Sequence, residues 1–164
     1  MGKSTLDEDL DLARGEIAQG NLEATLEWLM IAKHVAANTG MYLPTETVAA
    51  VLESAKEKGD VQAAYRKLVA EKLDFAKNRA GLGLLDYAIG YIEQAREYAD
   101  PSGMELPEET VTGIFETAYK ANIRERLIRI SHKVSISEPT LTKIEELARQ
   151  EGAIVAQAYL KRSS

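Results

Sequence analysis

Few residues in this chain have the types and spacing that chemistry requires. The sequence contains two histidines, His34 and His132, and no cysteine, which excludes thiol nucleophiles, thiolate zinc sites and disulfides. No HExxH or Glu-x-x-His pattern occurs, so the usual ligand spacings of zinc proteases and di-iron bundles are missing. We therefore expect no catalytic residue, no metal and no cofactor, and a protein that is not an enzyme.

One basic residue and one histidine stand close together in the stretch "RLIRISH", as Arg126 and His132. Their spacing loosely resembles the Arg-x(4–6)-His motif of the HEPN family of helical RNases and nucleotide-binding domains. The resemblance implies one possible function, a small helical nuclease that uses these two side chains.

The segment "ISHKVSISEPTLTKI", residues 130–144, resembles a helix-turn-helix. Ser131 stands where that motif has Ala, and Ser135 stands where it has the Gly of the turn. The apolar positions of the motif are filled by Ile130, Val134, Ile136, Leu141 and Ile144. Basic residues surround the segment, as phosphate contact requires. The resemblance implies nucleic-acid binding by residues 124–149 through Arg124, Arg126, Arg129, Lys133, Thr140 and Lys143. The alternative is two ordinary helices joined by a Ser-rich turn.

Charge is unevenly distributed along the 164 residues, whose formal net charge is −6. Residues 1–119 carry 11 Lys and Arg against 21 Asp and Glu, whereas residues 120–164 carry 9 against 5. Such an asymmetry indicates that the two ends face different partners, or that the acidic part attracts the basic part.

The elements that must position these residues are helices, and part of the chain occurs twice. "GMYLPTETV" at 40–48 returns as "GMELPEETV" at 103–111, a shift of 63 residues. At that shift, 13 of the 38 positions between residues 20 and 57 are identical to their counterparts, with no insertion. The pattern predicts an internal duplication.

The repeated phrase has a structural meaning. Gly40 and Gly103 are suited to end a helix in the left-handed conformation, which glycine adopts at little cost. Pro44 and Pro107 cannot continue that helix but are suited to begin the next one. Each copy therefore predicts a helix, a glycine stop, a short apolar loop and a second helix.

Apolar residues recur at helical intervals along the whole chain, without a competing strand pattern. The sequence predicts an all-α antiparallel array of about 7–8 helices in one domain, 1–164, with copies at about 1–59 and 60–121 and basic helices at 122–164. The expected helices span about 6–18, 22–38, 46–58, 61–80, 84–99, 108–120, 123–134 and 138 onward. A weak match at a further shift of 63 hints at a truncated third copy.

Residues 20–60 resemble one helical hairpin of the tetratricopeptide or pentatricopeptide repeats. The shared features are Gly20-Asn21-Leu22, Ala32, Gly40, Pro44 and Gly59-Asp60. The resemblance implies stacked helical hairpins, although those families repeat every 34 or 35 residues.

Our leading functional expectation is a non-enzymatic interaction module that presents a helical face to a protein or peptide. Trp28 and Tyr91 occupy equivalent repeat positions, and together with Tyr98 they are the expected partner-binding residues. A nucleic-acid-binding regulator is the alternative. No secretory signal or long apolar stretch is present, so we expect a cytoplasmic protein that does not use a membrane.

Overall fold

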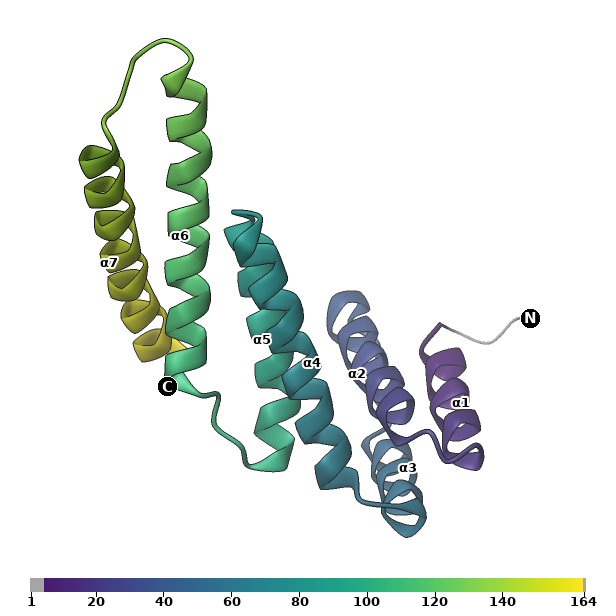
Figure 1. The fold of residues 1–164 in the computed structure, drawn as a ribbon. Coiled ribbons are helices and arrows are strands. Elements are labelled where there is room, and N and C mark those ends of the chain that lie inside the picture. Colours follow the sequence, from purple (N-terminus) through teal and green to yellow (C-terminus); the bar gives the residue numbers. More distant parts are fainter. Residues whose placement is uncertain (1–4, 164) are drawn as a thin grey trace. The chain divides into compact units, whose positions relative to one another are not determined.

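A computed structural model describes residues 5–163, which form seven α-helices and no strand (Figure 1). The helices are α1 (Thr5–Ala18), α2 (Leu22–Thr39), α3 (Thr45–Lys58), α4 (Val61–Gly81), α5 (Leu85–Ser102), α6 (Glu108–Ser131) and α7 (Glu138–Ser163). The all-α class predicted from the sequence is confirmed.

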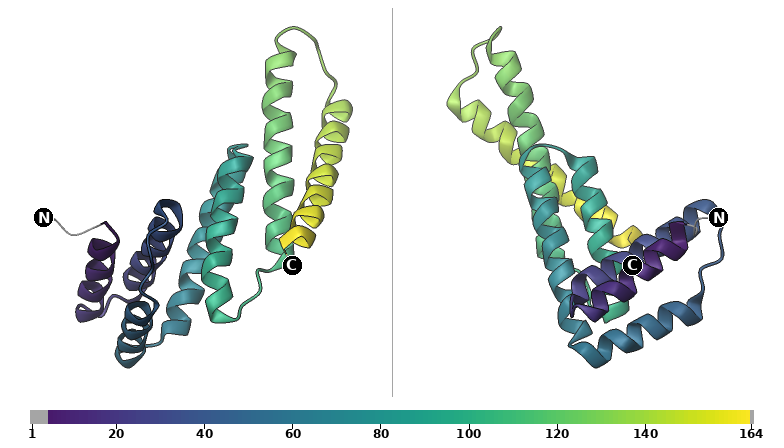
Figure 2. Two further views of the ribbon diagram at one scale, coloured as in Figure 1. Left: turned by 180° about the vertical axis from the view of Figure 1, so that it is seen from behind. Right: turned by 90° about the vertical axis from the view of Figure 1, so that its right-hand side faces the viewer.

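The chain divides into two compact units, Met1–Leu68 and Val69–Ser164, and α4 runs through the division. In the first unit, α1 packs along α2, and α3 contacts both of these helices. In the second unit, α6 and α7 are antiparallel neighbours (Figure 2), and α5 packs on α6. The expectation of a single domain stays a prediction.

Helical periodicity places the buried side chains where the sequence predicts them. In α1 the buried face carries Leu6, Leu10, Ala13 and Ile17, spaced three or four residues apart. Full burial of one leucine side chain stabilises a fold by about 1.5–3 kcal/mol. Short helices of this length depend on such packing, because an isolated helix of fewer than about 12–15 residues is marginal in water.

The duplication is visible in the backbone. Helix α2 spans Leu22–Thr39 and α5 spans Leu85–Ser102, so both ends shift by the 63 residues found in the sequence. Gly40 and Gly103 end these helices with φ/ψ of 70/11° and 73/13°. Pro44 and Pro107 precede the next helix in extended conformations, with φ/ψ of −72/90° and −66/117°. The predicted helix, glycine stop, loop and second helix are present in both copies.

The repeat extends further toward the N-terminus than sequence identity indicates. Helix α1 ends at Ala18 and α4 ends at Gly81, again 63 residues later. Four buried positions of α1 correspond to four buried positions of α4: Leu6/Val69, Leu10/Leu73, Ala13/Ala76 and Ile17/Ala80. Each copy is therefore a unit of three helices.

The sequence places a break between two helices near residue 121, and this expectation is wrong. Helix α6 is continuous over its 24 residues, from Glu108 to Ser131. The stretch Ala121-Asn122-Ile123 contains neither Gly nor Pro, so no residue there favours a stop. The helix expected over about 84–99 also extends further than predicted, because α5 includes Pro101 in its last turn and ends at Ser102.

The hint of a third copy is contradicted. A further shift of 63 residues places Glu146 at the position of Gly83, which adopts φ 76° in the turn before α5. Glu146 instead lies inside α7, which is helical from Glu138 to Ser163. Helix α7 and the end of α6 beyond Asn122 are therefore outside the repeat.

Candidate protein-binding surface

Helix α7 approaches α6 through a row of small residues. Ala148, Gly152 and Ala156 are buried and lie four residues apart, on one face of α7. A Cβ atom on Gly152 would lie 2.8 Å from the carbonyl oxygen of Phe115. Only glycine permits so close an approach of the two backbones.

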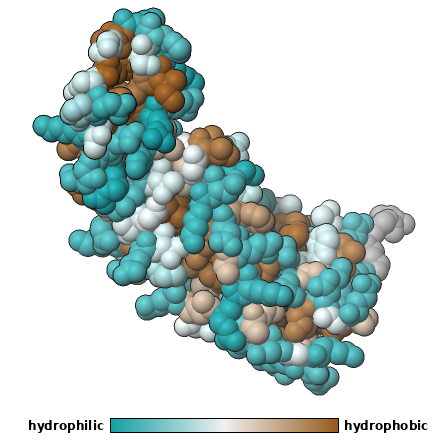
Figure 3. Space-filling model, viewed as in Figure 1, coloured by the Kyte–Doolittle hydropathy of each residue, from teal (hydrophilic) through white to brown (hydrophobic). Residues whose placement is uncertain are grey.

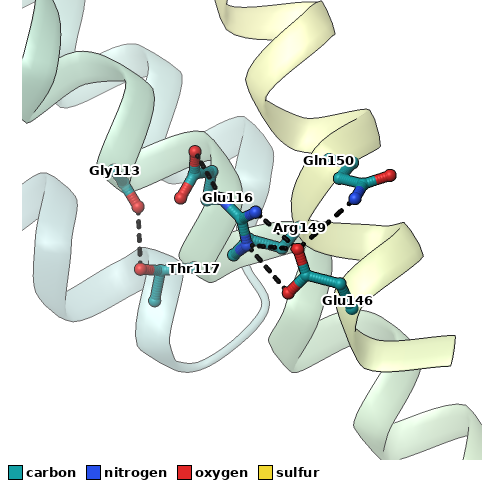
Figure 4. Close-up of polar contacts among 6 residues, drawn as sticks. All are labelled: Gly113, Glu116, Thr117, Glu146, Arg149 and Gln150. Carbon is teal, nitrogen blue, oxygen red and sulfur yellow. Dashed lines mark hydrogen bonds and ion pairs between the residues drawn. The ribbon is translucent and has the colours of Figure 1, made fainter. Parts of the chain in front are cut away.

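Ion pairs join the two helices beside this close contact. Arg149 of α7 lies 3.3 Å from Glu116 of α6 and also forms a hydrogen-bonded pair with Glu146 (Figure 4). Hydrogen bonding to Arg149 lowers the pKa of Glu146, and that of Arg149 rises in return. Arg124 of α6 lies 3.3 Å from Glu145 of α7. Each of these partly exposed pairs adds little to the stability of the fold.

The C-terminal part of α7 is held by Tyr159. Its ring lies 5.4 Å from that of Phe115 on α6, and the guanidinium of Arg96 on α5 lies 5.2 Å from it. Burial is the main cause of the raised pKa of Tyr159. Three helices of the second unit therefore meet at one aromatic side chain, and residues 132–137 connect α6 and α7 at the opposite end of the hairpin.

Two open grooves meet along α6 near that opposite end. A groove of about 520 Å³ lies between α6 and the end of α4, and one of about 410 Å³ lies between α6 and α7. Arg124 and Ile128 line both grooves. We define the hairpin-end surface as Leu82, Lys120, Arg124, Ile128, Leu141 and Glu145.

Large apolar side chains stand open to solvent on and around this surface. Leu82 is 60% exposed, Ile128 is 57% exposed and Val134 is 57% exposed. Figure 3 shows hydrophobic residues gathered at the tip of the α6–α7 hairpin, next to hydrophilic ones. An exposed apolar cluster with a polar rim is typical of an interaction surface.

The three predicted partner-binding residues, Trp28, Tyr91 and Tyr98, are not part of the hairpin-end surface. Trp28 is half-buried on α2 of the first unit. Tyr91 is half-buried on α5, where its ring lies 5.4 Å from that of Phe75. Tyr98 is only 5% exposed and belongs to the core of the second unit. Their role in binding a partner stays a prediction.

All six residues of the predicted nucleic-acid set are exposed, and three of them have partners within the chain. Arg124 pairs with Glu145, Arg129 pairs with Glu125 at 2.7 Å, and the Thr140 hydroxyl lies 2.8 Å from that of Ser137. The other three, Arg126, Lys133 and Lys143, form no ion pair among residues 5–163.

The geometry of residues 130–144 differs from that expected of a helix-turn-helix. Its apolar positions Ile130 and Val134 are exposed instead of buried, and α6 and α7 run antiparallel as a long hairpin. His132 follows the last residue of α6 and is exposed, and no hydrogen bond between it and Arg126 is found in the described part of the chain.

Sequence analysis did not identify Leu82 or Ile128 as site residues. The stretch "RLIRIS" does indicate an exposed apolar side chain, because it places three apolar residues within four positions. One face of a helix cannot bury all three. Only Leu127 of these three is buried. Leu82 lies between Gly81 and Gly83 in a turn, where sequence alone does not show which way a side chain faces.

Comparisons of the chain with protein-family models, curated proteins and solved structures gave no match. Between residues 5 and 163, no helix has the length and apolar character needed to cross a membrane. Over the same range, no group of three His, Asp or Glu side chains is arranged to hold a metal ion.

Proposed function

We propose that this chain is a non-enzymatic helical interaction module that binds a protein or peptide segment at the hairpin-end surface. One observation carries the proposal: Leu82 and Ile128 expose more than half of their apolar side chains beside two grooves. A partner's apolar side chain that entered these grooves would remove both residues from water, which stabilises association by about 25 cal/mol for each Å² buried.

The lining of the grooves favours a peptide over a nucleic acid. Glu125 lines the first groove, and Glu138 and Glu145 line the second. A phosphate backbone offers no apolar group to cover the exposed Leu82 and Ile128, which line the same grooves. A peptide can instead place apolar side chains against these residues and direct its own backbone groups toward the polar rim.

The test is a selection of binding peptides from a displayed library of random 16-residue sequences. We expect enriched peptides whose binding weakens about tenfold or more when Ile128→Asp introduces a charge into the grooves. The matched control is Ile154→Asp on α7, because Ile154 is exposed and lines neither groove. We expect the control to change affinity less than twofold.

Both variants replace exposed side chains, so circular dichroism should show an unchanged helical content. A library that yields no binder, or binders indifferent to both Ile128→Asp and Leu82→Asp, would refute the proposal. Binding of duplex DNA that falls steeply with salt, without any peptide binding, would favour the nucleic-acid alternative instead.

A further inference from the structure

We infer that the occupant of the hairpin-end surface is an acidic peptide segment with apolar anchor side chains. This inference rests on the proposed function and specifies the chemistry of the partner. Its basis is the balance of paired and unpaired charges at the free end of the α6–α7 hairpin.

Residues 120–164 contain nine Lys and Arg against five Asp and Glu. Three of the five acids are already engaged: Glu125 with Arg129, Glu145 with Arg124, and Glu146 with Arg149. Arg149 also engages Glu116, at 3.3 Å. These carboxylates are therefore not available to neutralise further cations.

Three cations that take part in none of these ion pairs lie at one end of the hairpin. Arg126 lies in the last two turns of α6, Lys133 lies in the connection that follows, and Lys143 lies in the second turn of α7. All three are exposed and form no ion pair in the part of the chain that the structure describes. Because α6 and α7 are antiparallel, their positions flank the same end of the helix pair.

At this end of the hairpin, Glu138 begins α7 and forms no ion pair with another described residue. A carboxylate at that position interacts with the positive end of the helix dipole, so it compensates the three cations only in part. The free end of the hairpin therefore has an excess of positive charge around exposed Ile128 and Val134. A complementary partner carries carboxylates beside apolar side chains.

The experiment uses the peptides enriched in the library selection and the full chain. We expect them to be acidic on average and to lose about tenfold in affinity when their Asp and Glu are changed to Asn and Gln. The triple variant Arg126→Glu, Lys133→Glu, Lys143→Glu should weaken the original peptides by a similar factor. It should also reduce the dependence of their affinity on salt.

The matched control is Lys33→Glu, Lys58→Glu, Arg66→Glu, which alters net charge equally at three exposed cations of the first unit. We expect it to leave affinity within about twofold of wild type, since these three residues belong to the first unit and line neither groove. Equal weakening by both triple variants would show only a general charge effect and would overturn the inference.

Failure of the inference is distinguishable from failure of the proposed function. Enriched peptides that are neutral or basic, yet lose affinity with Ile128→Asp, would leave the interaction module standing and remove the acidic preference. An absence of enriched peptides would remove both. Concentration-dependent self-association that Ile128→Asp abolishes would identify a second copy of the chain as the occupant, and would also overturn the inference.

Discussion

Gly59 and Asn122 occupy the same position in the two copies, 63 residues apart, but their backbones differ. Helix α3 ends at Lys58, just before Gly59, whereas α6 runs through Asn122 and continues to Ser131. The amide oxygen of Asn122 lies 2.8 Å from the position that a Cβ atom on Gly83 would occupy. The second copy therefore has an extended last helix, and that extension carries Arg124 and Ile128.

If the extension depends on an unbroken helix, Asn122→Pro should disrupt it. Proline in a helix interior costs about 3 kcal/mol, because it removes a hydrogen bond and clashes with the preceding turn. We expect lower helical content by circular dichroism and weaker peptide binding. The matched control is Glu108→Pro at the first position of α6, where the N–H has no intrahelical partner. An Asn122→Pro protein as helical and as stable as the control would contradict this interpretation.

The equivalence of the two copies can be measured at their glycine stops. Gly40→Ala and Gly103→Ala each force a side chain into a left-handed backbone, with φ of 70° and 73°. We expect each to lower the free energy of unfolding by about 1 kcal/mol, and the two losses to agree within about 0.5 kcal/mol.

Gly15→Ala serves as the comparison for these two variants, because Gly15 lies inside α1 and a Cβ atom there meets nothing within 4 Å. It should stabilise the protein slightly. Urea unfolding of the three variants measures these changes in the free energy of unfolding. A cost confined to one of the two stops would show that the copies are not equivalent in energy.

Because α6 and α7 approach closely at Gly152, a single added methyl group there should lower the stability of the protein. Gly152→Ala would place a Cβ atom 2.8 Å from the carbonyl oxygen of Phe115, so one helix must move. We expect a loss of about 1–3 kcal/mol in the free energy of unfolding. Gly113→Ala on α6 is the control, since a Cβ atom there meets nothing within 4 Å, and it should stabilise by about 0.5–1 kcal/mol. Similar effects of both substitutions would show that the helices are not in close contact.

Because the carboxyl group of Asp9 is buried, the stability of the protein should depend on pH. The residue is 5% exposed, and its Oδ2 atom has no hydrogen-bond partner among the described residues. Burial, and then the charge of Glu8, raise its pKa above the ordinary 3.8. Because the folded state disfavours the ionised form, the carboxylate destabilises the protein above the raised pKa, and the penalty diminishes as pH falls through that pKa toward 3.8.

Asp9→Asn should therefore raise the free energy of unfolding by roughly 0.5–1 kcal/mol at pH 7, with a smaller gain near pH 4. Thermal unfolding at the two pH values measures it. Glu57→Gln, an exposed position in the same unit, should change stability by less than about 0.5 kcal/mol at either pH. A gain from Asp9→Asn that does not depend on pH would exclude the burial of a charge as its cause.

The sequence predicted the fold class and most helix ends because these depend on local features. Gly40 and Gly103 terminate helices through their own backbone freedom, and apolar spacing marks the buried face of α1. The repeat fades at Asn122 and so predicts a break that α6 does not have, because the boundary of a repeat need not coincide with the end of a helix. Exposure of Ile128 depends on how α7 packs on α6, which in turn depends on the contact between Gly152 and Phe115. No periodicity in the sequence encodes that distant pairing.

The central claim is that a peptide binds where α6 extends beyond the repeat. Its most direct test is chemical-shift mapping by NMR, with an enriched peptide titrated into the labelled full chain. We predict that the largest shift changes occur at Leu82, Arg124, Ile128 and Leu141, around the two grooves. Largest changes in α1, α2 or α3 of the first unit, with the α6–α7 hairpin unaffected, would contradict the claim.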